Sequence, residues 1–286
     1  MTPMQITPLY IGRKRTNLIG LALSMSAMAL GLIALLWILF VLFSNGIAAL
    51  DFSIFTNDTP APGSEGGGLR NAIVGSLMIV GLAVAVSTPV GILAGVYLTE
   101  YGDTSKTAEF TRFVTDIMLS APSIVLGLFV YAIAVATVGN FSGYAGSLAL
   151  SLIAVPVVMR TTENMLRLVP GSLREAAFAL GAPRWKVATM VSLRAAKSGV
   201  ITGLLLAVAR ISGETAPLLF TALSNQFYST NMEGPMANLP VVIFQFAMSP
   251  YENWIRLAWG GALLITLAVL VLNILARVVF REKVRT

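Results

Sequence analysis

Residues 117–159 read IMLSAPSIVLGLFVYAIAVATVGNFSGYAGSLALSLIAVPVVM and contain no charged side chain in 43 positions. A membrane-spanning helix needs about 20 predominantly apolar residues, so this stretch is too long for a single span. It contains one turn-rich cluster, GNFSG at residues 139–143, where Gly and Asn favour a break in the helix. The stretch therefore predicts two membrane-spanning helices with a short connection between them.

The composition of the whole chain agrees with this prediction. Of the 286 residues, 56% are hydrophobic and 11% are charged, and the mean hydropathy is +0.82. Soluble domains carry about 25% charged residues, so this chain has too few to cover a water-facing surface. The composition excludes a soluble globular enzyme, and the high apolar content excludes a disordered chain.

Four further apolar stretches are long enough to span a membrane. They are residues 18–43, 71–99, 198–223 and 257–276. A fifth stretch, residues 239–248, is too short to span and is expected to be interfacial or re-entrant. We therefore expect an all-α membrane protein with six transmembrane helices.

The basic residues predict the orientation, because Lys and Arg accumulate in cytoplasmic loops. With the basic cluster at residues 13–15 inside, alternation places 16 of the 19 basic residues in inside segments. Only Arg70 and Arg256 then lie outside, and Arg210 lies within a span. Both termini are thus expected to be cytoplasmic. Because the net charge of +6 sorts by membrane side, we expect lipid rather than nucleic acid around the chain.

This topology divides the chain into four parts. Residues 1–17 form a cytoplasmic tail, residues 18–43 a retained first transmembrane helix, residues 71–276 a five-helix core, and residues 277–286 a second cytoplasmic tail. The apolar run of the first helix is longer than the ~7–15 residues of a signal peptide, so it is interpreted as an anchor.

The residue types that are missing limit the chemistry. The chain has no Cys and no His, which excludes disulfides, thiolate metal sites and the commonest general base. None of its five lysines follows a Gly, so the phosphate-binding Walker pattern is absent. We expect no catalytic residue, metal or cofactor in this chain, and any ATP that drives it is hydrolysed by a partner chain.

The segment between the fourth and fifth spans predicts a docking element. Ser172 and Glu175 have the spacing of a capping box, and Gly181 followed by Pro183 is typical of a helix end. The residues of the apolar stripe between them are Leu173, Ala176, Ala177 and Leu180. We expect a helix-turn-helix lying against the cytoplasmic face. A lipid-surface helix is the alternative, but an Ala-rich stripe buries little apolar area, which favours a protein partner.

The same segment resembles a known motif. Glu175-Ala176-Ala177, then Gly181, then Val191-Ser192-Leu193 is similar to the cytoplasmic EAA loop of ABC-importer permeases, with every spacing matched. The one departure is Arg194, where the general pattern has Pro. The runs RTTEN at residues 160–164, ARISGETAP at 209–217 and ARVV at 276–279 resemble the second, A-type permease subunit of bacterial phosphate ABC importers.

The resemblance implies a type I ABC importer permease fold with a coupling loop at residues 163–194. In that loop Glu175, Ala176, Ala177 and Gly181 are expected to engage the ATPase. It further implies a sister permease, two ATP-binding subunits and a periplasmic phosphate-binding protein as partners, and inorganic phosphate as cargo. Another oxyanion such as sulfate or molybdate, a self-contained anion channel and a membrane-embedded enzyme are the alternatives.

The fifth span contains the candidate substrate pathway. Arg210 and Glu214 are four residues apart and share one helix face, and charges at that depth mark a pathway by default. Gly213 and Pro217 are expected to kink or open the helix beside them. An Arg fork matches phosphate oxygens, and Arg160 is a candidate second station. These three charged positions match those that the family implicates. The alternatives are a static ion pair for Arg210 and Glu214, and ordinary loop topology for Arg160.

Overall fold

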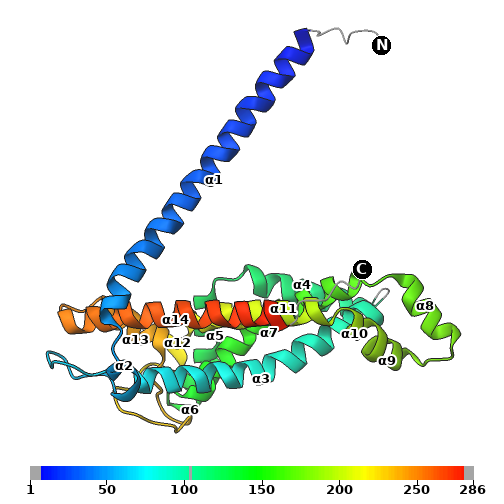
Figure 1. Cartoon of the computed structure of the whole chain (residues 1–286). Coiled ribbons are helices and arrows are strands. Elements are labelled where there is room, and N and C mark those ends of the chain that lie inside the picture. The colour runs from blue at the N-terminus through cyan, green and yellow to red at the C-terminus, as the bar shows by residue number, and fades with distance from the viewer. Residues whose placement is uncertain (1–7, 103–104, 280–286) are drawn as a thin grey trace.

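The computed structural model describes residues 8–102 and 105–279, and every regular element in these parts of the chain is a helix (Figure 1). Four helices are long and apolar enough to cross a membrane. They are α1 (Pro8–Ala49), α3 (Arg70–Glu100), α7 (Gly143–Arg167) and α14 (Glu252–Val279). The all-α membrane architecture predicted from composition is confirmed.

Two bent pairs of segments raise the number of spans to six if each pair crosses once. In the first pair, α4 (Lys106–Ser120) and the helical segment that follows it are bent by 107° relative to each other. That segment consists of α5 (Ser123–Val130), the π-helical turn η1 (Tyr131–Val135) and α6 (Ala136–Val138).

In the second pair, a segment of three short helices meets α11 (Lys197–Ser212) at 74°. The three are α9 (Arg184–Lys186), the π-helical turn η2 (Val187–Ser192) and α10 (Leu193–Ala195). The remaining helices are α2 (Ser53–Thr56), α8 (Gly171–Ala179), α12 (Ala216–Thr221) and α13 (Leu239–Ala247). At nine residues α13 is too short to span, as its apolar run predicted.

The long uncharged stretch breaks twice. At the predicted cluster, Gly139 has φ +78° and Ser142 caps α7 by accepting a hydrogen bond from the Ala145 N–H at 3.1 Å. The second break, at Ala121 and Pro122, was not predicted. A residue before Pro is driven out of the helical region, and Ala121 has ψ 137°, so α4 ends there. The third predicted span therefore begins in a separate helix and turns sharply.

The parallel helices α3 and α7 form the centre of the fold. Gly91 packs against Val158 and Gly95 against Thr162, so the helices approach closely where side chains are small. Ser147 Oγ donates to the Ile79 carbonyl at 3.1 Å across the same interface. Their packing creates a buried layer shared with α11, α12 and α13. Its larger members are Ile79, Leu150, Ile153, Ile211, Leu218, Met236 and Val241.

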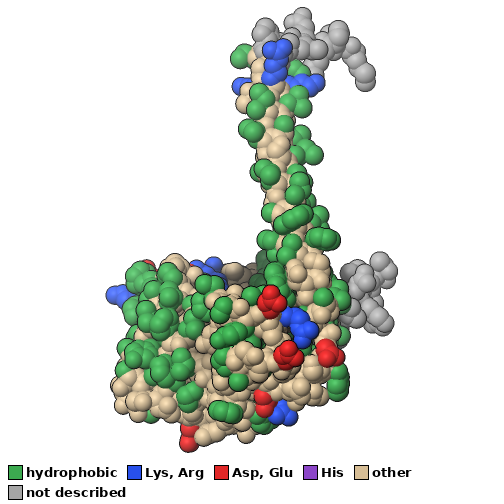
Figure 2. All heavy atoms as spheres, turned by 90° about the vertical axis from the view of Figure 1, so that its left-hand side faces the viewer, with side chains coloured by type: hydrophobic (Ala, Val, Ile, Leu, Met, Phe, Trp, Pro, Cys, Tyr) green, Lys and Arg blue, Asp and Glu red, His purple; other side chains and the backbone are tan. Residues whose placement is uncertain are grey.

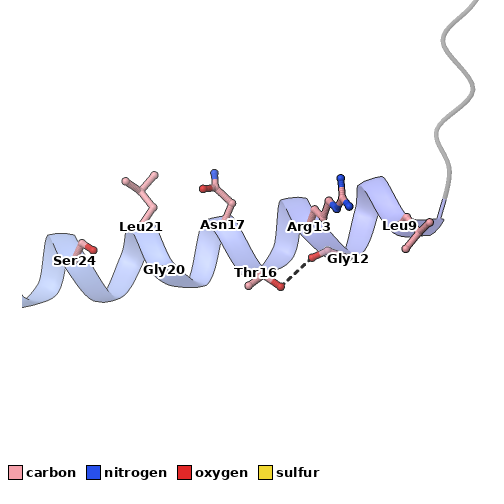
Figure 3. A pocket seen from close by; sticks show the side chains of 8 residues that line it. All are labelled: Leu9, Gly12, Arg13, Thr16, Asn17, Gly20, Leu21 and Ser24. Carbon is pink, nitrogen blue, oxygen red and sulfur yellow. Dashed lines mark hydrogen bonds between the residues drawn. The ribbon is translucent and has the colours of Figure 1, made fainter.

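Helix α1 projects away from the other helices and contacts them near its C-terminal end (Figures 1 and 2). Gly46 lies against Leu263 of α14, whereas every residue from 12 to 38 is exposed. Small residues recur every four positions along one side, at Gly12, Thr16, Gly20 and Ser24 (Figure 3). This spacing is typical of membrane helices that approach another helix closely.

The helices other than α1 define two ends of the molecule. The α2 end carries α2, α13 and the first residues of α3 and α7, and the α8 end carries α8 and the last residues of α3 and α7 (Figure 1). The predicted tails are only partly visible, because residues 1–7 and 280–286 lie outside the described residues. The prediction that both termini are cytoplasmic therefore concerns residues outside the described part of the chain.

Candidate functional site

The fifth predicted span is interrupted beside its charged pair. Helix α11 ends at Ser212, residues 213–215 are not helical, and α12 resumes at Ala216 with Pro217 in its first turn. The Gly213 N–H bonds the Arg210 carbonyl at 3.2 Å, which tightens the last turn of α11. The helix break predicted from Gly213 and Pro217 is confirmed, and it leaves polar backbone next to Arg210.

Arg210 and Glu214 form a loose ion pair. Arg210 Nε lies 3.8 Å from Glu214 Oε1, which is beyond hydrogen-bond distance. The Arg210 side chain is 45% exposed and that of Glu214 is 15% exposed. Arg210 belongs to an exposed stripe of α11 with Thr202 and Leu206, and the buried Ala207 and Ile211 lie on the adjoining face. The guanidinium is therefore available to a group that this chain does not supply.

Arg160 lies in a charge cluster at the α8 end of α7. Its Nη2 is 2.5 Å from Asp116 Oδ1, and its Nη1 is 3.2 Å from Glu163 Oε2. Glu163 is 1% exposed and also accepts from Arg112 Nε at 2.7 Å and Arg167 Nη2 at 2.6 Å. A buried carboxylate is tolerated only when it is paired, and here three guanidiniums surround it.

Arg160 and Arg210 lie at different depths. Gly199 packs against Met165 and Gly203 against Thr161, so α11 runs antiparallel to α7. Arg210 follows Gly203 by seven residues on α11, which places it about 10 Å further from the α8 end. The two arginines therefore do not form one binding pocket, and they lie at successive levels of the helix bundle.

Helix α8 contains the predicted coupling residues. None of its residues is buried, and Figure 1 shows it projecting at its end of the molecule rather than lying against the bundle as expected. Glu175 and Ala176 are exposed, and Ala177 is half-buried. Gly181 has φ +78°, its N–H bonds the Phe178 carbonyl at 2.9 Å, and the Ala182 N–H bonds the Ala177 carbonyl at 3.1 Å. These two hydrogen bonds form the Schellman motif, which is the helix end that Gly181 predicted.

The predicted capping box at Ser172 and Glu175 is wrong. Helix α8 begins at Gly171 after Pro170, and no side chain caps its N-terminus. Ser172 is therefore already inside the first turn, where its hydroxyl cannot serve as the cap. The next helix begins at Arg184 after Pro183, close to the position that the sequence indicated.

The charged residues that surround Arg160 were not identified from the sequence: Glu163 and Arg167 on α7, and Arg112 and Asp116 on α4. Arg160, Glu163 and Arg167 are spaced i, i+3 and i+7, a pattern that places them on one helix face. That spacing was the available signal. Arg112 and Asp116 come from α4, so only the packing of α4 on α7 brings them to Glu163 and Arg160.

Comparisons with known proteins give the class. A family model described as binding-protein-dependent transport system inner membrane component matches residues 87–282. A bacterial alginate ABC transporter chain has the same fold, with a TM-score of 0.67 at 15% identity over 98% of this chain and 99% of that one. A chain of the MetNI methionine ABC transporter gives 0.57 at 21% identity over 74% and 92%. The protein is a multi-pass inner-membrane permease with the type I ABC importer fold.

Sequence relatives narrow the class. The phosphate transport system permease protein PstA of Yersinia pestis is 59% identical over 271 residues, covering 95% of this chain and 92% of its own length. PstA of Haemophilus influenzae is 59% identical over 274 residues, covering 96% and 97%. PstA 1 of Mycobacterium tuberculosis strain H37Rv is 36% identical over 97% and 91%. The chain belongs to the PstA family of phosphate transport system permease proteins.

Proposed function

We propose that this chain is the permease subunit of an ATP-driven importer that moves inorganic phosphate across the cytoplasmic membrane. The observation that carries the proposal is the 59% identity to PstA of Yersinia pestis across 95% of the chain. The relatives quoted above are named for phosphate transport, which favours phosphate over sulfate or molybdate as cargo.

Arg210, Glu214 and Arg160 are proposed as the substrate pathway. A guanidinium offers a planar set of donors to phosphate oxygens, and the loose contact with Glu214 leaves Arg210 free to bind and release an anion. Arg160, nearer the α8 end, is a second station whose neighbours Asp116 and Glu163 limit how tightly an anion is held.

The assembly is proposed to contain three kinds of partner. A sister permease faces the exposed stripe of α11, so that the pathway beside Arg210 lies between two chains. The assembly contains two ATP-binding subunits, and an ATPase docks on α8 through Glu175, Ala176, Ala177 and the turn at Gly181. A periplasmic phosphate-binding protein delivers the cargo at the α2 end. ATP is bound by those partners, this chain holds no cofactor, and both of its termini are cytoplasmic.

The test is uptake of labelled phosphate in cells that lack every other phosphate uptake route, with and without this chain. We expect uptake only with the chain present, and no inhibition by excess sulfate or molybdate. The complex purified through this chain is expected to contain an ATPase. If excess sulfate or molybdate abolished uptake, the cargo would be assigned to another oxyanion. Uptake without any associated ATPase would favour a self-contained channel.

A further inference from the structure

One guanidinium connects α8 to three other segments of the chain. Arg174 Nε lies 3.1 Å from Glu100 Oε1, at the end of α3, and 3.2 Å from Ser192 Oγ in η2. Its Nη1 donates to the Val169 carbonyl at 3.1 Å, and its Nη2 donates to the Leu166 carbonyl at 2.8 Å. A single side chain of α8 thus contacts the ends of both central helices.

The chemistry of these contacts favours a cation at this point. The Leu166 carbonyl belongs to the last turn of α7, where the helix dipole attracts positive charge. It also accepts the Val169 N–H at 3.2 Å, and a carbonyl oxygen has a second lone pair for Arg174. Glu100 places a carboxylate at the end of α3, where the dipole disfavours it unless a cation is near. Arg174 and Glu100 are both largely buried, so water screens their contact weakly.

Arg174 links α8 to the end of α7, close to the charge cluster around Glu163. Helix α8 buries none of its own residues, so side-chain hydrogen bonds are a main attachment to the bundle. Leu166 follows Glu163 by three residues, which is less than one helical turn. Because α3 and α7 are packed tightly at Gly91 and Gly95, a force applied at their ends moves them together.

We propose that Arg174 is the positioning residue that passes displacement of α8 to the paired helices α3 and α7, and through them to the cluster around Glu163. The proposal rests on the proposed function, in which the ATPase moves α8. The ion pair with Glu100 connects α8 to α3, whereas the hydrogen bond to the Leu166 carbonyl connects α8 to α7. A displacement of α8 therefore reaches both helices.

The experiment uses the complete complex reconstituted in vesicles with the phosphate-loaded binding protein. The variants are Arg174→Gln, Arg174→Lys and Glu100→Gln, and Ser172→Ala is the matched control on an exposed position of the same helix. For Arg174→Gln we expect the ATPase to remain bound and hydrolysis to continue. Phosphate moved per ATP should fall at least about tenfold, because the variant loses all four guanidinium contacts and the charge-assisted bond to Glu100 alone accounts for about that factor. Arg174→Lys should recover part of the ratio, because it keeps the charge without the fork.

Three outcomes would overturn the proposal. One is an unchanged ratio of phosphate to ATP in Arg174→Gln, and another is loss of the ATPase from both Arg174 variants, which would make Arg174 part of the docking surface. If the Arg174 variants do not fold or insert in the membrane, Glu100→Gln is measured instead, because it keeps the other three hydrogen bonds. An unchanged ratio of phosphate to ATP in Glu100→Gln also overturns the proposal. Leu180→Glu tests separately whether the ATPase docks on α8, as the proposed function states. Leu180 is 89% exposed, and an ATPase that stays bound to this variant would show that α8 is not its docking site.

Discussion

At the scale of single residues, two kinds of charge must be distinguished. Glu163 is buried and accepts hydrogen bonds from three arginines, so its charge is balanced within the chain. Arg210 is half-exposed and meets the acidic Glu214 at 3.8 Å. A balanced buried charge is tolerated in the fold and is costly only when a partner is removed, whereas an incompletely balanced one remains available to a ligand.

The first prediction concerns Arg210 and Glu214. If Arg210 only balances Glu214, the double variant Arg210→Gln, Glu214→Gln should restore what either single change loses. We expect instead that the double variant folds and assembles but takes up phosphate at least about tenfold more slowly, because a charged donor to the anion is lost. Arg210→Lys should recover only part of the rate, since an ammonium lacks the planar fork.

The measurement is labelled phosphate uptake, with complex assembly followed in parallel. Full uptake by the double variant would assign Arg210 and Glu214 to the scaffold rather than to the pathway.

The second prediction concerns Glu163. Glu163→Gln removes the charge that three guanidiniums share, and we expect the free energy of unfolding to fall by about 2 kcal/mol. The matched control is Asp58→Asn, which breaks the exposed pair with Arg70 at 3.0 Å and should cost under about 1 kcal/mol. Thermal unfolding of the detergent-purified complexes distinguishes the two, and equal shifts for both variants would contradict this account.

The sequence predicted one of these charge groups and missed the other for a physical reason. Arg210 and Glu214 lie four residues apart in an apolar run, so helical geometry alone places them together. Arg112 is 51 residues from Glu163, and the contact depends on how α4 packs against α7. Local periodicity contains no information about that packing.

At the scale of elements, helix ends were predicted at glycines that have a Pro, a turn-forming residue or a charge close by. Gly139, Gly181 and Gly213 were interpreted correctly, and each marks a helix end in the structure. The break at Pro122 was missed because it lies inside a long run without a charge, where only the rule on the residue before Pro could have indicated it.

The third prediction tests the end of α8. Gly181 has φ +78° and open space where a Cβ would lie, so Gly181→Val strains the backbone by about 1–2 kcal/mol without a clash. We expect normal membrane insertion, weakened retention of the ATPase and loss of transport. Gly171→Val is the control, because Gly171 lies on the same helix in equally open space and without positive φ.

Co-purification of the ATPase and phosphate uptake are measured for both variants. Retained ATPase and normal uptake in Gly181→Val would show that the shape of this turn is not needed for coupling.

At the scale of the whole molecule, contacts between distant segments place loops on a common side. The Asn71 side chain, at the start of α3, donates to the Asn225 carbonyl at 2.9 Å, and the Gly143 N–H, at the start of α7, donates to the Gly234 carbonyl at 3.2 Å. The segment between α12 and α13 therefore lies at the α2 end, with the first residues of α3 and α7. Arg174 and Glu100 lie at the α8 end.

The last prediction assigns these ends to the two sides of the membrane. Reporters fused after Gly63 or Asn231 should be periplasmic, and reporters after Lys106, Arg184 or Arg285 cytoplasmic, because 16 basic residues lie in inside segments and 2 in outside ones. Arg285 lies outside the described residues, so its fusion tests the sequence-based topology alone. The Asn231 fusion is the most informative, since its side depends on α11 crossing the membrane. A cytoplasmic signal there would mean that α11 does not cross the membrane, and the six-span topology would then have to be abandoned together with the placement of Arg210 within the bilayer.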